Sequence, residues 1–201
     1  MSLRHALLGV LVARPMSGYE LSQFFDSSTG WVWTAPHSQI YPLLGRMEND
    51  GVIEAEDQVR GTRLKRKVYS VTPDGLEELK EWIGTPHPTP GSRDPVLTQA
   101  LLFDMIEPER AAAVLDTFIV EQETIARESR EHSKRLLAKE TPLLRERLKN
   151  RPAHDHGRIS RLKANVFEGQ AMMAETRAAW ARTELTLLYD DEPDSASPSA
   201  P

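Results

Sequence analysis

Five cations gather in one short stretch of the chain, residues 60–67, which reads RGTRLKRK. The stretch holds no acidic residue, whereas the whole chain carries a formal charge of −5, so the cluster does not follow from bulk composition. Cationic side chains at this density suit the phosphates of a nucleic acid, although a charge run is more often a solvated surface. The contacts predicted here are Arg60, Thr62, Arg63, Lys65, Arg66 and Lys67.

A second group of polar side chains precedes this stretch, on a helix predicted from near Thr34–Pro36 to Asp50-Gly51. Its buried face is predicted by apolar residues at helical spacing, namely Ile40, Leu43, Leu44 and Met47. The remaining face suits the major groove of DNA, with Gln39 pairing to adenine and the hydroxyls of Ser38 and Tyr41 contacting phosphates. The residues predicted for DNA contact, which would otherwise be ordinary solvent-facing side chains, are His37, Ser38, Gln39, Tyr41, Pro42 and Arg46.

The helices that position these groups are bounded by local signals. A first helix is predicted over residues 2–13, because Pro15 disfavours helical structure at the residue before it. The order Ser17-Gly18-Tyr19-Glu20 predicts a capping box that starts a second helix. The third helix is expected to stop at Gly51, a residue that accepts the left-handed conformation of a helix C-terminus.

Two short strands, Val52-Ile53 and Val68–Val71, are predicted on either side of the basic turn. A fourth helix follows, with Thr72 as its cap and Pro73 at its first position. A helix followed by a two-stranded hairpin with a cationic tip is the outline of a winged helix on DNA.

The chain divides at residues 84–95, GTPHPTPGSRDP, where four prolines and two glycines fall within twelve positions. Proline lacks the amide donor and fixes its own dihedral angle, so the segment cannot continue a helix or enter a sheet. The predicted parts are a DNA-binding domain (residues 1–84), a linker (85–94), a helical dimerisation and possible sensor domain (95–189) and a disordered tail (190–201).

The half after the linker is predicted to be helical almost throughout. One run covers residues 108–139, and a second begins after the break at Asn150-Arg151-Pro152. Both carry residues at spacings of three and four, a seam that requires a partner. The two helices either pack on each other within the chain or exchange between two subunits, and their length favours exchange. The predicted dimer contacts are Leu115, Phe118, Ile125, Ile159, Leu162, Val166, Met173 and Trp180.

Together these elements predict a mainly α fold: an N-terminal winged helix-turn-helix with a small β-hairpin wing, plus a C-terminal long-helix dimerisation domain. The chain of 201 residues is long enough to bury such a core. It has no cysteine, which excludes disulfides and thiolate metal sites. No apolar segment approaches the ~18–20 residues of a membrane span, so we expect a soluble cytoplasmic protein without membrane contact.

Residue types that support catalysis lack a supporting arrangement. The sequence His154-Asp155-His156 has metal-ligand chemistry, but no third ligand stands at a suitable spacing. No Gly-rich phosphate loop or nucleophile motif is present. We therefore expect no enzyme, no cofactor and no metal, with an enzyme or metal-binding protein built on the helical half as an alternative.

The segments LLGVLVARPMSGYEL, SQIYPLLGRMENDGVI and RKVYSVTPDGLEELKEWI resemble, in order and spacing, the N-terminal pattern of PadR-like transcriptional regulators. This resemblance spans about residues 3–83. The C-terminal half, two long helices after the short PVLTQALLFDM, resembles by layout the larger dimerisation domain of one PadR subgroup. The resemblance implies a dimeric winged-helix repressor or activator, often one whose DNA affinity changes when a small molecule binds.

One part of the sequence departs from that family. Near the start of the recognition helix, where the family often has a small polar residue, this chain has Pro36, and Ser38 stands where glycine is frequent. The capping contact is therefore expected to shift to Thr34. Pro42 fits the family pattern but removes one backbone hydrogen bond, which predicts a slight bend or a frayed first turn.

The chain is accordingly expected to bind a pseudo-palindromic operator of double-stranded DNA as a homodimer and to act as a repressor. The alternative is a winged-helix module that binds protein without sequence-specific DNA binding. Two tryptophans, Trp31 and Trp33, lie between the second and third helices. They either line a pocket for a small aromatic effector or wedge the third helix against the core.

Overall fold

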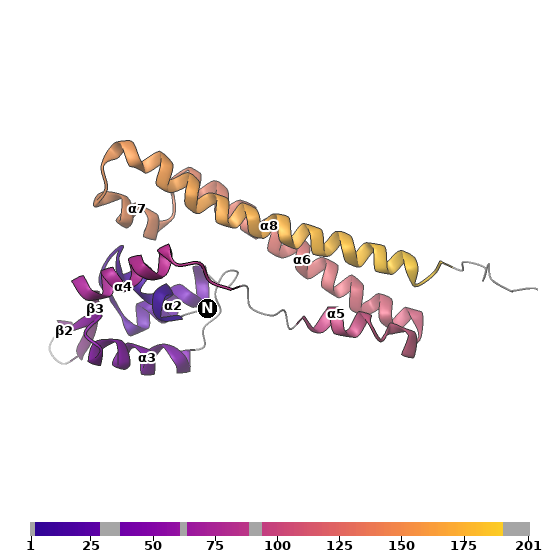
Figure 1. The fold of residues 1–201 in the computed structure, drawn as a ribbon, viewed down its shortest axis with the longest axis horizontal. Helices are drawn as coiled ribbons and strands as arrows, with labels where there is room; N and C mark the ends of the chain where they lie inside the picture. The colour runs from indigo at the N-terminus through magenta and orange to yellow at the C-terminus, as the bar shows by residue number, and fades with distance from the viewer. Residues whose placement is uncertain (1–2, 29–36, 61–63, 89–93, 191–201) are drawn as a thin grey trace, which may run out of the picture. The chain divides into compact units, whose positions relative to one another are not determined.

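The fold is drawn in Figure 1 from a computed structural model that describes residues 3–28, 37–60, 64–88 and 94–190. These residues form two compact units. The first unit holds the described residues up to Pro88 together with Arg135–Leu162. The second holds the described residues from Asp94 to Lys134 and from Lys163 onward.

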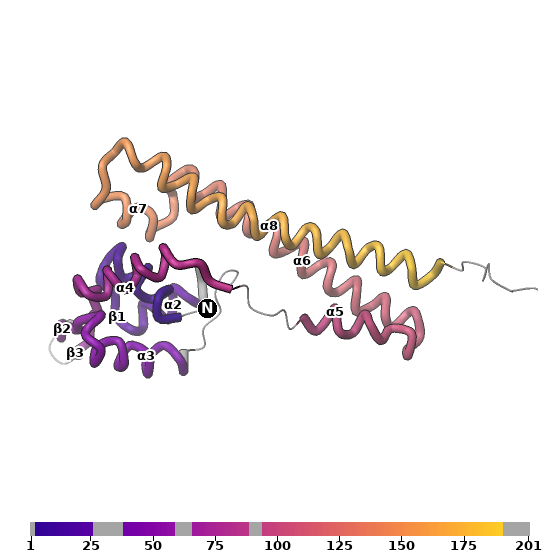
Figure 2. The backbone as a smooth tube through the Cα atoms, viewed as in Figure 1, coloured from indigo at the N-terminus to yellow at the C-terminus, as the bar shows by residue number. Residues whose placement is uncertain are grey.

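The first unit has the order of elements that defines a winged helix, as Figure 2 also traces. In chain order they are α1 (Leu3–Leu11), β1 (Met16–Ser17), α2 (Gly18–Ser28), α3 (His37–Asn49), β2 (Ile53–Arg60), β3 (Leu64–Val71) and α4 (Pro73–Gly84). The short helices α7 (Pro142–Lys149) and η2 (Ala153–Asp155) belong to the same unit. The predicted fold class, a mainly α chain with a small wing, is confirmed.

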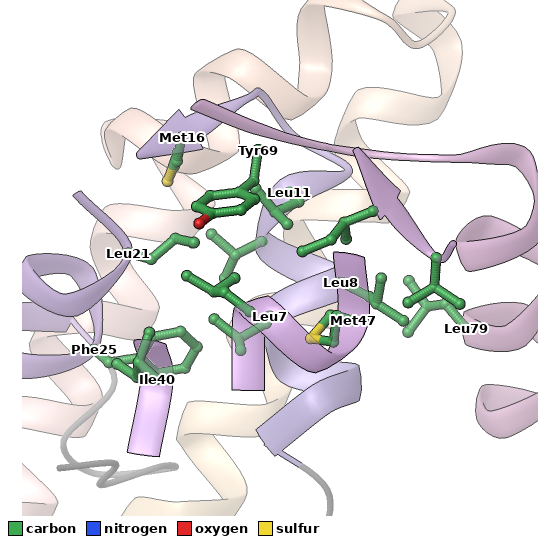
Figure 3. Packing of buried hydrophobic residues seen from close by; sticks show 14 residues of the cluster. Leu7, Leu8, Leu11, Met16, Leu21, Phe25, Ile40, Met47, Tyr69 and Leu79 are labelled. Carbon is green, nitrogen blue, oxygen red and sulfur yellow. The ribbon is translucent and has the colours of Figure 1, made fainter. Parts of the chain in front are cut away.

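One apolar core holds this unit together. It draws buried side chains from α1, α2, α3, α4 and the sheet, and in Figure 3 they gather around Leu7. Burying a side chain of this size stabilises a fold by about 1.5–3 kcal/mol. The fully buried members are Leu7, Leu8, Leu21, Ile40, Leu44, Met47 and Ile53. The predicted buried face of the third helix is therefore confirmed, with Leu43 only partly buried.

The sheet has three antiparallel strands in the order β1-β3-β2, one more than the predicted hairpin. The extra strand, β1, pairs Met16 with Tyr69 and Ser17 with Val68. A helix-capping residue has extended dihedrals, so Ser17 can both cap α2 and pair with a strand. Two residues are too few to produce a periodic signal, which is why sequence patterning did not reveal β1.

The hairpin strands are also longer than predicted, at eight residues each. Their register runs from Ile53 opposite Val71 to Arg60 opposite Leu64. The added part of β2 is acidic and carries little strand propensity of its own. One of its carboxylates faces a cation across the ladder, since Asp57 lies opposite Lys67, and opposite charges at such positions favour pairing.

The predicted capping box at the start of α2 is present. The hydroxyl of Ser17 accepts a hydrogen bond from the Glu20 amide at 3.3 Å, and the Glu20 carboxylate accepts one from the Ser17 amide at 2.9 Å. Thr72 caps α4 as predicted, because its hydroxyl accepts from the Gly75 amide at 3.2 Å.

The predicted stop of α3 is also confirmed. Gly51 has a φ of +75°, in the left-handed region that glycine tolerates. The Gly51 amide donates to the carbonyl of Glu48 at 3.1 Å, and the Val52 amide donates to that of Met47 at 3.1 Å. These two bonds form a Schellman motif, and the buried Val52 then leads directly into β2.

The second unit contains the helices α5 (Pro95–Ala100), η1 (Phe103–Met105), and most of α6 (Pro108–Leu137) and α8 (His156–Leu187). Ion pairs join Arg130 to Glu168 and Glu123 to Arg182, so α6 and α8 run antiparallel. The predicted long helices are thus present, and α7 is a further helix between them that ends just before the predicted break at Asn150-Arg151-Pro152. Among the described residues no helix is both long and apolar enough to cross a bilayer.

Within this unit α8 packs on α6 through small residues. The buried side chains of α8 here are Ala164, Ala171, Ala174, Ala178 and Ala181. Together with the half-buried Phe167, these alanines follow one another at alternating spacings of three and four residues, which places them along one side of the helix. Of the two arrangements left open by the sequence, pairing within the chain is therefore present, and it uses this alanine stripe.

Candidate nucleic-acid interface

The helix α3 presents a polar face to solvent on the side opposite its core residues. Ile40, Leu44 and Met47 are 0 % exposed, whereas Tyr41 on the other side is 51 % exposed. The helix continues through Pro42 without interruption. The predicted contact residues whose side chains are described and exposed are Ser38, Gln39, Tyr41, Pro42 and Arg46. The side chain of His37, the remaining prediction on this helix, lies outside the described part.

The wing places two of its predicted cations beside this helix-turn-helix. Lys67 Nζ lies 3.1 Å from both carboxylate oxygens of Glu48, in the last turns of α3. Arg66 Nη1 lies 3.6 Å from a carboxylate oxygen of Glu20, in the first turn of α2. The base of the wing is therefore connected to both helices. The hydrogen bond that Lys67 donates to the Glu48 carboxylate raises the pKa of Lys67, which keeps the ammonium charged.

The other predicted wing residues fall at the tip. Thr62 and Arg63 lie outside the described residues, as do the side chains of Arg60 and Lys65. The register that pairs Arg60 with Leu64 still places this cationic stretch at the end of the hairpin. In the described part of the chain, the exposed polar face of α3 and the cations Arg66 and Lys67 of the wing provide groups suited to a phosphate backbone.

Glu20 combines two roles at the start of α2. Burial by itself would raise its pKa, but hydrogen bonds from Ser17 and Arg14 outweigh burial and lower the pKa. Glu20 is therefore ionised when it meets Arg66. Sequence analysis identified its capping role but not this ion pair, because the partner lies 46 positions away along the chain.

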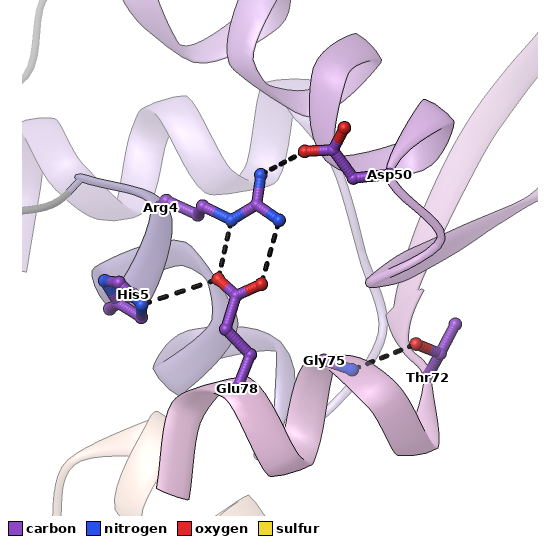
Figure 4. A network of polar contacts seen from close by, with 6 residues as sticks. All are labelled: Arg4, His5, Asp50, Thr72, Gly75 and Glu78. Carbon is purple, nitrogen blue, oxygen red and sulfur yellow. Dashed lines mark hydrogen bonds and ion pairs between the residues drawn. The ribbon is translucent and has the colours of Figure 1, made fainter. Parts of the chain in front are cut away.

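A charge network fixes the far end of α3, as Figure 4 shows. Arg4 Nε donates to Glu78 Oε1 at 2.6 Å, and Arg4 also pairs with Asp50 beside the end of α3. His5 Nε2 lies 3.4 Å from the same Glu78 oxygen. The bond from Arg4 lowers the pKa of Glu78, so one ionised carboxylate joins α1 to α4. No local pattern in the sequence revealed this network.

The predicted dimer residues separate into two groups. Leu115 and Phe118 are buried within the second unit, and Ile125 and Trp180 are partly buried there. By contrast, Leu162, Val166 and Met173 are exposed on α8, on a different side of the helix from the alanine stripe, and Ile159 is half-buried. We call Leu162, Val166 and Met173 the outer stripe of α8.

The second unit also has a groove of about 700 Å³ along α6 and α8. Its lining consists of charged side chains and two alanines and contains no aromatic side chain. Ion pairs join Arg130 to Glu175 and Arg182 to Glu123 across it. Trp31 and Trp33, the predicted effector pocket, lie outside the described residues. In the described part of the chain no group of three or more potential metal ligands is close enough to hold an ion.

The N-terminal half of the chain is similar in sequence to known transcriptional regulators. Residues 7–81 match the family model of the "Transcriptional regulator PadR-like family". The "Negative transcriptional regulator PadR" of Bacillus subtilis (strain 168) is 32% identical over 111 residues, 55% of this chain and 61% of that protein. The "Probable transcriptional regulator Rv1176c" of Mycobacterium tuberculosis is 39% identical over 117 residues, 58% of this chain and 62% of that protein. The match thus spans less than two thirds of either relative.

Solved structures resemble a larger part of the chain. The crystal structure of Bacillus subtilis PadR in complex with operator DNA matches with a TM-score of 0.72 at 24% identity, over 92% of this chain and 98% of that one. The Vibrio cholerae virulence activator AphA matches with a TM-score of 0.63 at 24% identity, over 93% and 98%. At this identity the likeness establishes the fold, including the long C-terminal helices.

Proposed function

Because residues 7–81 match the model of the PadR-like family of transcriptional regulators, we propose that this chain is a transcriptional regulator that binds double-stranded DNA. The observation that carries the proposal is the surface formed by α3 and the wing. The exposed polar face of α3 enters the major groove, and the wing cations contact the adjacent phosphates. Bacillus subtilis PadR, which shares the fold, has been crystallised with operator DNA.

The regulator acts as a homodimer on a pseudo-palindromic operator. The outer stripe of α8 leaves Leu162 at 61 % and Met173 at 64 % exposure, apolar surface that a second copy would cover. Two recognition helices related by a two-fold axis read half-sites about 34–36 Å apart. Binding over a promoter blocks the polymerase, so repression is the proposed mode, in keeping with the negative regulator among the relatives.

A small aromatic molecule is the proposed effector that releases the DNA. The support is a structural neighbour, Bacillus subtilis PadR, which was also crystallised with p-coumaric acid. The groove along α6 and α8 is lined by charged side chains and two alanines and has no aromatic side chain, so its chemistry differs from that of an aromatic site. Trp31 and Trp33 remain the side chains proposed to contact the effector.

The function is tested by a gel shift of the full chain on the DNA upstream of its own gene, over a range of salt. If four or five wing cations per subunit each neutralise a phosphate, log affinity falls against log salt with a slope of roughly −7 to −9 for the dimer. The double change Arg63→Ala with Arg66→Ala flattens that slope and weakens binding to all sequences. An unchanged slope removes the wing from the interface.

The alternative function is protein binding by the winged helix. The ion pairs of Arg66 and Lys67 within the chain are the observation that favours it, since paired cations are less available to phosphate. This function predicts no shift of any duplex at low salt. The alternative is contradicted if the protein shifts a duplex, if the shift weakens as salt rises, and if a selected sequence keeps its shift to higher salt than a random one.

A further inference from the structure

The first residue of α2, Gly18, is buried beneath an aromatic ring of α3. A Cβ atom built at Gly18 would lie 2.7 Å from Cε1, 3.2 Å from Cδ1 and 3.3 Å from Cζ of Tyr41. Real Cβ contacts do not approach as closely as 2.7 Å. The ring of Tyr41 therefore occupies the space that any side chain at Gly18 would need.

The backbone on both sides of this contact is fixed. Ser17, next to Gly18, caps α2 and also pairs with Val68 in the sheet. Ile40, next to Tyr41, is fully buried in the core. If a side chain were added at Gly18, the two helices could not move apart without losing these contacts, so the ring would have to move instead.

The ring belongs to the surface proposed for DNA. Tyr41 is 51 % exposed although its ring covers Gly18, so one edge packs on α2 while the rest faces solvent. Two cations, Arg14 and Arg66, lie near the same turn of α2 through their ion pairs with Glu20. A phenol hydroxyl can donate a hydrogen bond to a phosphate oxygen, and the cations on the first turn of α2 favour the same anionic partner.

We propose that Gly18 is a positioning residue for DNA binding: its missing side chain lets the ring of Tyr41 pack on the first turn of α2, which holds the phenol hydroxyl against a DNA phosphate. This inference rests on the proposed DNA-binding function. A held side chain loses less conformational entropy on binding than a free one, so the contact with Gly18 strengthens the phosphate contact of Tyr41.

The test is a double-mutant cycle on Gly18→Ala and Tyr41→Ala in the full-length protein. The probe is a labelled 30-base-pair duplex obtained by repeated selection of random DNA on the unchanged protein. Alanine fits the start of a helix, so Gly18→Ala keeps the fold. Gly9→Ala is the matched control, because a Cβ at Gly9 in α1 would meet nothing within 4 Å.

We expect Gly18→Ala to weaken binding about three- to tenfold, the range of one hydrogen bond, with Gly9→Ala unchanged. In the Tyr41→Ala background, Gly18→Ala should then have no further effect, because no ring remains to be displaced. Tyr41→Phe should lose a similar factor, since it removes only the hydroxyl. Thermal unfolding midpoints of Gly18→Ala and the unchanged protein should agree.

Several results would overturn the inference. Equal losses from Gly18→Ala with and without the Tyr41 ring would mean that Gly18 acts by another route. Undiminished affinity of Gly18→Ala, or of Tyr41→Phe, would mean that the hydroxyl is not held for phosphate. These results leave DNA binding by the unchanged protein intact. Failure to select any duplex would instead reject the proposed function, and this inference with it.

Discussion

Lys67 of the wing and Glu48 of the recognition helix form an ion pair in which Nζ lies 3.1 Å from each carboxylate oxygen. The pair holds β3 to the C-terminal part of α3, so the two parts of the proposed interface keep a set spacing. It also means that Lys67 already has an anionic partner before any phosphate arrives. Glu48 therefore competes with DNA for the cation that it positions.

Replacing Glu48 with glutamine frees Lys67 for phosphate. We expect Glu48→Gln to bind random-sequence DNA several-fold more tightly, with a salt slope steeper by about 2 for the dimer. The measurement is fluorescence anisotropy with a random duplex at several salt concentrations. Glu56→Gln is the control, because it removes the same charge from an exposed residue of β2 for which the described structure has no ion pair. Equal slopes in the two variants would contradict the competition.

The charge network of Glu78 makes stability depend on acidity in a defined direction. Arg4 lowers the pKa of Glu78 below its ordinary value of 4.5, so the unfolded chain binds the proton first as pH falls. The stabilisation is present above about pH 4.5 and is lost as pH falls through the lowered folded value. We expect Glu78→Gln to cost about 1–2 kcal/mol at pH 7 and much less near pH 3.

Urea unfolding at the two pH values measures this difference. Glu77→Gln is the control on the same helix, because within the described residues the one ion pair of Glu77 is with the exposed Lys80 three residues later. Such a surface pair contributes about 0–1 kcal/mol. A loss for Glu78→Gln that is as large at pH 3 as at pH 7 would show that packing, not ionisation, is responsible.

Gly75, in the first turn of α4, lies against the backbone of Val52, the residue before β2. A Cβ at this position would lie 2.0 Å from the Val52 carbonyl oxygen, and backbone cannot rotate away as a side chain can. We expect Gly75→Ala to destabilise the protein by about 2–4 kcal/mol in urea unfolding. Gly84→Ala, at the open end of the same helix, should change stability by less than about 1 kcal/mol.

Dimerisation is tested on the outer stripe of α8. We expect Leu162→Glu with Val166→Glu to convert a dimer into monomers in size-exclusion chromatography with light scattering. Burying these two apolar side chains would contribute about 3–6 kcal/mol per subunit to dimer stability. The unpaired charges of the double variant would oppose association further if they were buried. The control Asn165→Glu places one carboxylate on a neighbouring exposed position outside the stripe. Dimers that persist in the double variant would place the interface elsewhere.

The sequence predicted those parts of the fold that depend on neighbouring residues. The capping box of Ser17 and Glu20, the left-handed Gly51 and the Thr72 cap are all local, so composition over four residues was sufficient. The apolar face of α3 was predicted for the same reason, because its helical period is visible in one segment.

Features that depend on distant residues were not predicted. The strand β1 exists because Val68 and Tyr69 offer it a partner, and the bonds of Arg4 depend on Glu78 and Asp50. On α8 the large apolar residues of the outer stripe were predicted as helix contacts. The helix instead packs on α6 through alanines, which let the two helix backbones come close. Small side chains carry little hydrophobic signal, although they permit the tightest helix contacts. The DNA contacts themselves stay predictions from chemistry and exposure.

The Schellman motif at Gly51 leaves only three residues between α3 and β2, so this connection is short and rigid. Two hydrogen bonds from Thr72 hold the connection further: the hydroxyl donates to the Gly51 carbonyl at 2.7 Å, and the amide donates to the Val52 carbonyl at 3.1 Å. On the proposed operator, α3 and the wing would therefore bind as one rigid unit. Where the DNA does not match the shape of this unit, the double helix has to bend or twist. Base steps that never touch the protein would thus influence operator choice through their stiffness.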